Sequence, residues 1–151
     1  MFITRNVVQS AQNPPTTGCC ISGYHVAYGS PVQTYVMAEF DTSNRLKGKN
    51  LTTLSHEVAE WADNPLLTNN APAWGGIGQI PRDCQLDNEV GDPFTTSLLS
   101  ISMPNGVTYN VTELAFFSWF FGGPSYGAGG LYSSNGAFTG SSKACPPGGT
   151  N

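Results

Sequence analysis

Residues 31–43, PVQTYVMAEFDTS, are rich in β-branched and aromatic residues, and two sets of side chains alternate along them: Gln33, Tyr35, Met37 and Glu39 against Thr34, Val36, Ala38 and Phe40. A period of two residues is typical of a β-strand with two different faces, so this segment is predicted to be a strand. A hairpin is predicted at Ser97–Val111, where apolar runs flank the turn sequence Pro-Asn-Gly. The stretch from Thr68 to Cys84 shows no period and is predicted to be a loop.

A helical period replaces the strand period from Leu51 to Pro65, LTTLSHEVAEWADNP. At about 100° per residue, the apolar side chains fall on one arc and are expected to face the core. They are Leu51, Leu54, Val58, Trp61 and Ala62. Pro65 is expected to end the helix, because the residue before a proline is disfavoured in the α region.

The far side of this helix carries His56, Glu60 and Asp63, and Glu57 sits between the two arcs. Residues i and i+4 lie one above the other, so His56 and Glu60 can present a nitrogen and an oxygen to one point. Zinc accepts such ligands at about 2 Å. Glu57 is placed to take a proton from a water molecule that the metal activates. The ordinary alternative is a solvated polar helix face.

Composition makes this polar face unusual. Only 11% of the 151 residues are charged, yet three acids and a histidine fall within eight residues of the helix. The length fits one domain, residues 1–151, and the 18 glycines and 11 prolines predict many turns and short strands. A net charge of -4 argues against a nucleic-acid partner. No apolar run approaches the roughly 20 residues of a membrane span.

Two later segments are less regular. The apolar run Thr112–Gly123, TELAFFSWFFGG, is predicted to be either a buried strand or a short buried helix. The Gly/Ser-rich tail from Pro124 contains spaced aromatic residues, so ordered loops and short strands are expected there, held by Cys145.

An even number of cysteines, four, in a chain of low charge favours two disulfides and an extracellular location. Because a bond between the adjacent Cys19 and Cys20 would be strained, each is predicted to pair with Cys84 or Cys145. Residues 1–17 lack a basic start and an apolar run, so no signal peptide is expected and an exported chain would be the mature form.

The motif His-Glu-x-x-Glu at residues 56–60 is a variant of the H-E-x-x-H signature of zincin metalloproteases. SHEVAEWADNP followed by NEVGDP resembles more closely a group of secreted zincin-like proteins with S-H-E-x-x-E-x-x-x-D-P and then N-E-[IV]-G-D. The resemblance spans residues 35–93. It departs at Asn64, where the group has an aspartate before the proline, and the neighbouring Asp63 is the candidate to replace that carboxylate.

The resemblance implies that His56 and Glu60 are zinc ligands and that Glu57 is the general base. A third ligand is expected from the acidic stretch 83–93, because a catalytic zinc usually has three protein ligands. Glu89 in the Asn-Glu motif is the first candidate, and Asp92 either orients His56 or is itself the ligand.

His25 is the other histidine of the chain and lies in the strand-like sequence GYHVAYG. It is expected to bond to backbone rather than to a metal, and becomes the next candidate ligand only if neither Glu89 nor Asp92 serves.

These observations predict an α+β domain of zincin type, with a twisted, mostly antiparallel sheet packed against the His56 helix and with Gly-rich, disulfide-pinned loops. The expected function is zinc-dependent hydrolysis of a peptide or protein substrate by an extracellular monomer. The strand at Tyr35–Phe40 is expected to be the edge along which an extended substrate pairs.

Two alternatives stay open. One is a non-catalytic calcium-binding module with oxygen ligands, because calcium takes six to eight oxygens and no histidine. Its ligands would be Asp83, Asp87, Glu89 and Asp92. The other is an extracellular ligand-binding domain that keeps a degenerate zincin helix.

Overall fold

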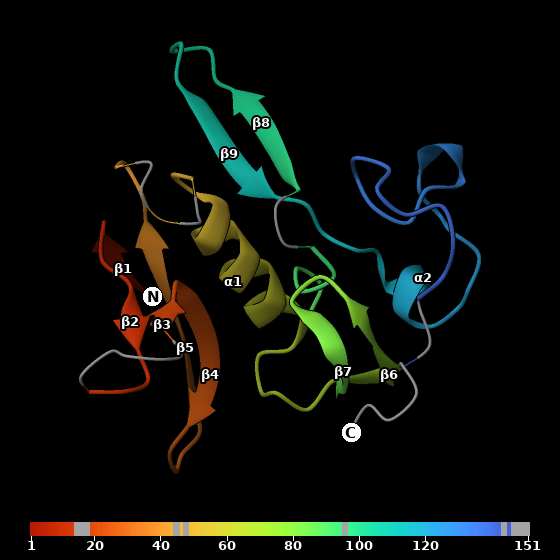
Figure 1. Ribbon diagram of the computed structural model, residues 1–151, viewed down its shortest axis with the longest axis horizontal. Helices are drawn as coiled ribbons and strands as arrows, with labels where there is room; N and C mark the ends of the chain where they lie inside the picture. Colours follow the sequence, from red (N-terminus) through yellow and green to blue (C-terminus); the bar gives the residue numbers. More distant parts are fainter. Residues whose placement is uncertain (14–18, 44–45, 47–48, 95–96, 143–144, 146–151) are drawn as a thin grey trace.

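The computed structural model describes residues 1–13, 19–43, 46, 49–94, 97–142 and 145. These residues form a mixed α+β, strand-rich structure with two α-helices and small sheets (Figure 1). The mixed α+β class is therefore confirmed. No described helix is long and apolar enough to cross a membrane.

A three-stranded sheet forms the N-terminal part, with the strand order β1-β5-β4. Strand β1 (Phe2–Arg5) runs parallel to β5 (Gln33–Phe40), and β4 (Gly23–Tyr28) runs antiparallel to β5. The strand predicted at residues 31–43 is confirmed as β5. The prediction that it is an edge strand is wrong, because β1 and β4 pair with its two sides.

The remaining strands form three antiparallel pairs rather than one larger sheet. They are β2 (Gln9–Ser10) with β3 (Cys19–Ile21), β6 (Asn70–Ile77) with β7 (Ile80–Asp87), and β8 (Leu98–Ser102) with β9 (Thr108–Thr112). The β8–β9 pair is the hairpin predicted around Pro-Asn-Gly.

The β6–β7 pair corrects the prediction of a loop between Thr68 and Cys84. Its ladder is interrupted by register shifts, so the sequence shows no period of two. Trp74 anchors the pair, because its ring is fully buried and its indole N–H donates to the carbonyl of Asp87 at 2.9 Å.

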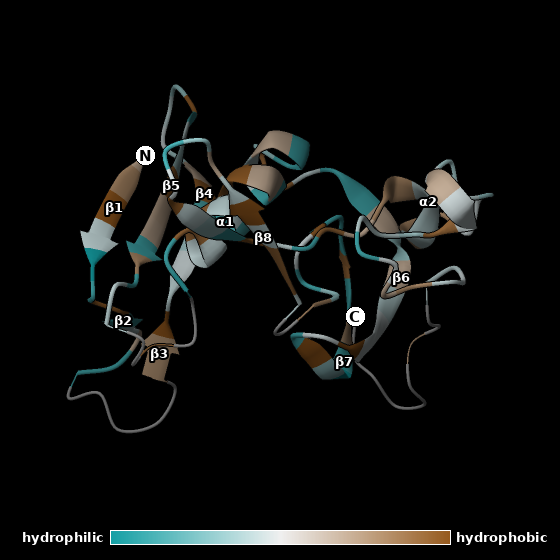
Figure 2. Ribbon diagram, turned by 90° about the horizontal axis from the view of Figure 1, so that it is seen from above, coloured by the Kyte–Doolittle hydropathy of each residue, from teal (hydrophilic) through white to brown (hydrophobic). Residues whose placement is uncertain are grey.

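Helix α1 (Thr52–Asp63) is present as predicted, but it turns its other face inward. Glu57 and Glu60 are buried, whereas Val58 and Trp61 are 37% and 38% exposed. The reason is that α1 lies between the three-stranded sheet and the β6–β7 side of the molecule (Figures 1 and 2). Both sides supply residues that interact with the polar side chains of α1. Trp61 keeps a polar partner at the surface by donating to Thr34 Oγ1 at 2.8 Å.

The main core lies on the β6–β7 side and is aromatic. Its buried members are Ala71, Trp74, Val90, Phe94, Ala115, Trp119 and Phe120. The ambiguous segment 112–123 supplies a short helix, α2 (Phe117–Phe120), and the ring of Trp119 stacks on Phe138 from the tail at 5.0 Å. The described tail thus consists of ordered loops with one 3-10 turn, Ala128–Gly130, and its Ser133 forms an isolated bridge to Ala115.

The cysteines pair differently from the prediction. Cys84 on β7 pairs with Cys145, and Cys19 pairs with Cys20 beside it on β3. The predicted pairings fail because β3 and β7 lie on opposite sides of α1, so the cysteines on β3 cannot reach Cys84 (Figure 1).

Candidate metal centre

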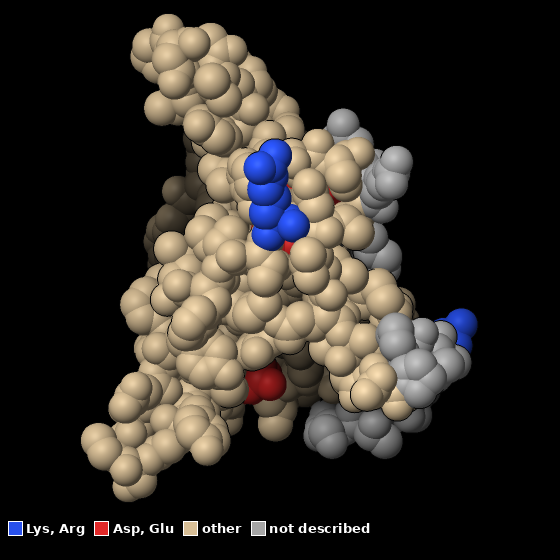
Figure 3. Space-filling model, turned by 90° about the vertical axis from the view of Figure 1, so that its left-hand side faces the viewer, with Lys and Arg blue, Asp and Glu red and all other residues tan. Residues whose placement is uncertain are grey.

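Histidines and carboxylates from three parts of the fold meet beside α1. We call this group the His–carboxylate cluster. Its members are His25 of β4, His56, Glu57 and Glu60 of α1, and Glu89 and Asp92 of the loop after β7. Its glutamates are buried, and little acidic surface is visible on the face of the molecule in Figure 3.

Two carboxylates converge on one nitrogen of His56. Its Nε2 lies 3.1 Å from Glu60 Oε1, as the i,i+4 spacing predicts, and 3.4 Å from Asp92 Oδ1. The second oxygen of Asp92 accepts a hydrogen bond from Gln85 at 3.1 Å, which fixes the direction of the carboxylate.

The ring of His56 lies directly against the backbone at Gly91. A Cβ atom at this position would stand 2.3 Å from Nδ1 of the ring, so a side chain of any size would displace the histidine. Glu60 is tied to the same residue, because the Gly91 N–H donates to Glu60 Oε1 at 3.1 Å. The glycine of the N-E-V-G-D motif thus allows the loop to touch the helix.

Apolar anchors hold this loop in place. Val90 and Phe94 are buried in the aromatic core, and the carbonyl of Val90 accepts from the N–H of Ala115 at 2.9 Å. Glu89, just before the first anchor, and Asp92, between the two anchors, face the histidines.

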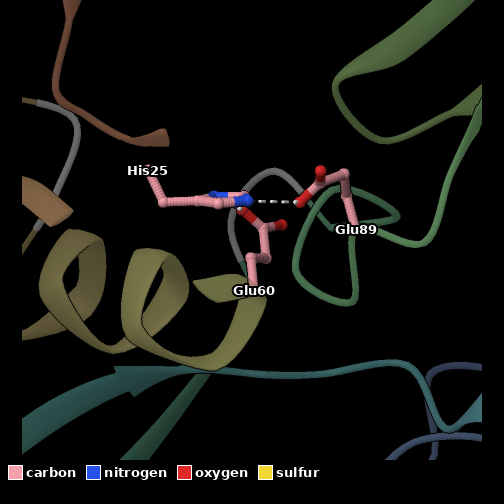
Figure 4. A group of neighbouring side chains, drawn as sticks. All are labelled: His25, Glu60 and Glu89. Carbon is pink, nitrogen blue, oxygen red and sulfur yellow. Dashed lines mark ion pairs between the residues drawn. The ribbon is translucent and has the colours of Figure 1, made fainter. Parts of the chain in front are cut away.

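His25 does not behave as predicted. Instead of bonding to backbone, it enters the cluster, with Nδ1 3.7 Å from Glu57 Oε2 and Nε2 3.8 Å from Glu89 Oε2 (Figure 4). His25 Nε2 and Glu89 Oε2 are both buried and have no hydrogen-bond partner. Strand β4 approaches α1 this closely because Gly23 has no side chain: a Cβ there would lie 2.7 Å from Glu57 Cγ.

The cluster is short of positive charge. Within the described ranges, no lysine or arginine forms an ion pair with its carboxylates. Burial lowers the pKa of His56, but its hydrogen bonds to Asp92 and Glu60 and the nearby carboxylates outweigh this and raise the pKa well above the usual value. Burial likewise lowers the pKa of His25, while Glu57, Glu89 and Glu60 raise it to a net increase.

The buried carboxyls also favour their protonated forms. Burial raises the pKa of Glu60, although His56 opposes the effect. For Glu89, burial and the charge of Glu60 raise the pKa to about 8. The metal-free cluster therefore holds protons where it lacks cations.

The donor set fits zinc. Imidazole nitrogen and carboxylate oxygen are zinc ligands, and bonds of about 2 Å place neighbouring ligands of a tetrahedral ion about 3.3 Å apart. The two contacts of His56 match this spacing. Ligand atoms lie within 4.8 Å of one another in two groups, His56–Glu57–Glu60 and His25–Glu60–Glu89. The structure thus brings Glu89 to His25 rather than to His56, whereas the sequence ranked His25 only as a candidate ligand after Glu89 and Asp92.

Asn64 and Asp63 do not join the cluster. Asn64 is fully buried, and its side-chain oxygen accepts from the N–H groups of Thr68 and Asn69, both at 2.8 Å. Asn64 therefore has a structural role, closing the turn after α1. Burial raises the pKa of Asp63 to about 6, and Asp63 lines a separate groove.

That groove has a volume of about 940 Å³ and is mostly apolar. It runs along α1 and the site loop, to which it is joined by Ala59 and Val90, and reaches α2. Its apolar walls come mainly from Leu114, Phe116, Phe117, Phe121 and Tyr126.

The geometry gives little support to the alternative of a calcium site. Asp83 is exposed on β7, and Asp87 is paired opposite Asn70 in the β6–β7 ladder. Glu89 and Asp92 instead face histidines, which calcium does not select.

Neither a protein-family profile nor a curated protein nor a solved structure matches the chain. Function must therefore be argued from the site itself.

Proposed function

We propose that this protein is a zinc-dependent peptide hydrolase of zincin type, acting outside the cytoplasm as a monomer. The observation that carries the proposal is the convergence of Glu60 and Asp92 on Nε2 of His56, with Glu57 on the next position of the helix. The motif resemblance also points to His56, Glu57 and Glu60.

His56 and Glu60 are the proposed zinc ligands, and the 3.4 Å contact favours Asp92 over Glu89 as the third ligand at this histidine. Gln85 orients Asp92, and Gly91 keeps the ring of His56 in place. A bound zinc ion would polarise the scissile carbonyl and acidify a water molecule.

Glu57 is the proposed general base. Its carboxylate lies within 4.8 Å of the ligand atoms of His56 and Glu60, so it can accept a proton from the attacking water. The same carboxyl can then deliver that proton to the leaving nitrogen of the peptide.

A peptide substrate has a strand edge available beside the cluster. β4 carries His25 and, among the described strands, pairs only with β5, so an extended peptide can add to its other side. The apolar groove along α1 offers room for apolar side chains of the substrate.

The test compares wild-type protein, saturated with zinc, with Glu57→Gln in hydrolysis of labelled casein and of a peptide library. Loss of the base should lower the rate by about 10²–10⁴-fold, while metal content stays unchanged. Asp83→Asn, which removes an exposed acid outside the cluster, is the matched control and should retain full activity. Equal hydrolysis by Glu57→Gln and wild type would remove Glu57 from the mechanism.

A second candidate is an extracellular metal-binding module without catalysis. Two observations favour this candidate. Glu57 is buried. The proposed ligand set is also rich in carboxylates, and their negative charge makes zinc a weaker Lewis acid. Stoichiometric zinc without cleavage of any library peptide would select this candidate.

A further inference from the structure

The carboxylate of Glu60 faces two histidines from opposite sides. Oε1 lies 3.1 Å from His56 Nε2, and Oε2 lies 4.0 Å from His25 Nδ1. Ligand atoms of His25, Glu60 and Glu89 lie within 4.8 Å of one another, so the Glu60 carboxylate, which also contacts His56, is placed to bridge two ions.

The side of Glu60 that faces His25 has the features of a ligand-binding site. His25 is 9% exposed, and its Nε2 faces Glu89 Oε2 with neither atom hydrogen-bonded (Figure 4). Their separation of 3.8 Å is too long for a hydrogen bond, but it suits two ligands of one ion with bonds of about 2 Å. Glu57, 3.7 Å from Nδ1, can orient the ring as outer carboxylates do for metal-bound histidines.

We propose a second divalent transition-metal site formed by His25, Glu60 and Glu89, with Glu60 bridging this ion to the ion at His56. The inference rests on the proposed zinc site for the bridge. Two ions that share a carboxylate lie about 3.5–4 Å apart in proteins.

Charge supports two ions rather than one. The cluster contains four carboxylates and no described lysine or arginine partner. Two divalent cations neutralise four carboxylates with both histidines neutral, whereas one cation leaves two carboxylates that protons must balance.

The two positions differ in access to solvent. The side chain of His25 is 4% exposed and that of His56 is 12% exposed. The His25 ion is therefore the inner ion, which holds Glu60 in place and should exchange slowly, and the His56 ion is the outer one, which meets substrate.

The test uses the full chain, stripped of metal, reloaded with Zn²⁺ or Co²⁺ and dialysed. Elemental analysis should give two ions per wild-type chain and one per chain in both His25→Ala and His56→Ala. In the Co²⁺ form, magnetic coupling should weaken the electron paramagnetic resonance signal of wild type, and each single variant should restore an uncoupled signal. Circular dichroism checks folding, and Glu89→Gln replaces His25→Ala if that variant does not fold. Asp83→Asn should keep two ions.

The outcomes separate this inference from the proposed function. One ion in wild type that is lost in both histidine variants means that a single ion uses both rings, which overturns the inner site and leaves the hydrolase proposal intact. One ion that survives His25→Ala also overturns the inner site. No bound ion in wild type overturns both proposals.

Discussion

Two buried regions of this protein hold carboxylates in different ways. Glu113 is fully buried, and its carboxylate accepts hydrogen bonds from the hydroxyls of Ser97 and Ser133 and from the N–H of Asn135 at 2.7 Å. The His–carboxylate cluster gathers several acids in one place and leaves Glu89 Oε2 without a hydrogen-bond partner.

The difference separates a structural acid from a binding site. Neutral donors surround Glu113 and satisfy its single charge permanently, so nothing further is needed there. The acids of the cluster repel one another, and only protons or cations can relieve that repulsion. A buried carboxylate is thus a candidate ligand when its surroundings fail to satisfy it.

The largest expected effect is on the cluster side. Glu60→Gln replaces one oxygen of the carboxylate that bridges the two proposed ions with an amide nitrogen, so metal affinity should fall by more than the about 10–100-fold lost with outer partners. The metal-free variant should melt no lower than metal-free wild type, because it has lost a buried charge and kept its shape. Calorimetric titration with Zn²⁺ and thermal melts measure both quantities. Wild-type affinity in this variant would contradict the bridging role of Glu60.

A smaller effect, of the opposite kind, is expected at Glu113. Glu113→Ala leaves buried donors unsatisfied and should lower the free energy of unfolding by about 3–5 kcal/mol. Urea denaturation measures this loss, and the zinc affinity of the folded variant should be unchanged. Glu113→Gln, which keeps an acceptor oxygen, should lose less. A weaker zinc affinity in either variant would show that the two regions are coupled.

The smallest effect is the pH dependence of the metal-free protein. The folded-state pKa of Glu89 is about 8 against 4.5 for the free group, and those of Glu60, His25 and His56 are also raised. The folded chain therefore binds more protons than the unfolded chain. The stability contributed by Glu89 is lost as pH rises from 4.5 to about 8, and that contributed by His25 and His56 is lost as pH rises above 6.5. Melting temperatures should fall by a few degrees over this window.

Bound zinc should cancel or reverse this fall in melting temperature with rising pH, because zinc binding displaces the protons of the cluster. Glu113→Gln should keep the wild-type slope, whereas Glu60→Gln should flatten it. A metal-free protein whose stability rises between pH 5 and pH 8 would contradict the raised pKa values.

The sequence predicted what depends on local periodicity. The strand β5, the β8–β9 hairpin and helix α1 follow from their residue patterns, and so does the approach of His56 to Glu60. The buried face of α1 could not be predicted in this way. A helical wheel ranks side chains by hydrophobicity, but Glu57 and Glu60 are buried because His25 and Gly91 come from elsewhere to meet them.

Long-range pairing explains the other errors. His25 reaches the cluster only because β4 pairs with β5 and Gly23 brings it close to the helix, and neither relation appears in the local sequence of His25. The pairing of Cys84 with Cys145 likewise depends on where the tail returns, 61 positions later in the chain.

The contact between Gly91 and His56 bears on how relatives of this protein can be found. A glycine in a motif often indicates an unusual backbone angle. Here the absence of a side chain at Gly91 instead leaves room for the imidazole ring of His56. Val90 can change to another apolar residue without moving that ring, because its task is to anchor the loop. A search pattern built on this geometry should therefore hold positions 56 and 91 fixed as a pair, require a small residue at position 23, and leave position 90 free among apolar residues.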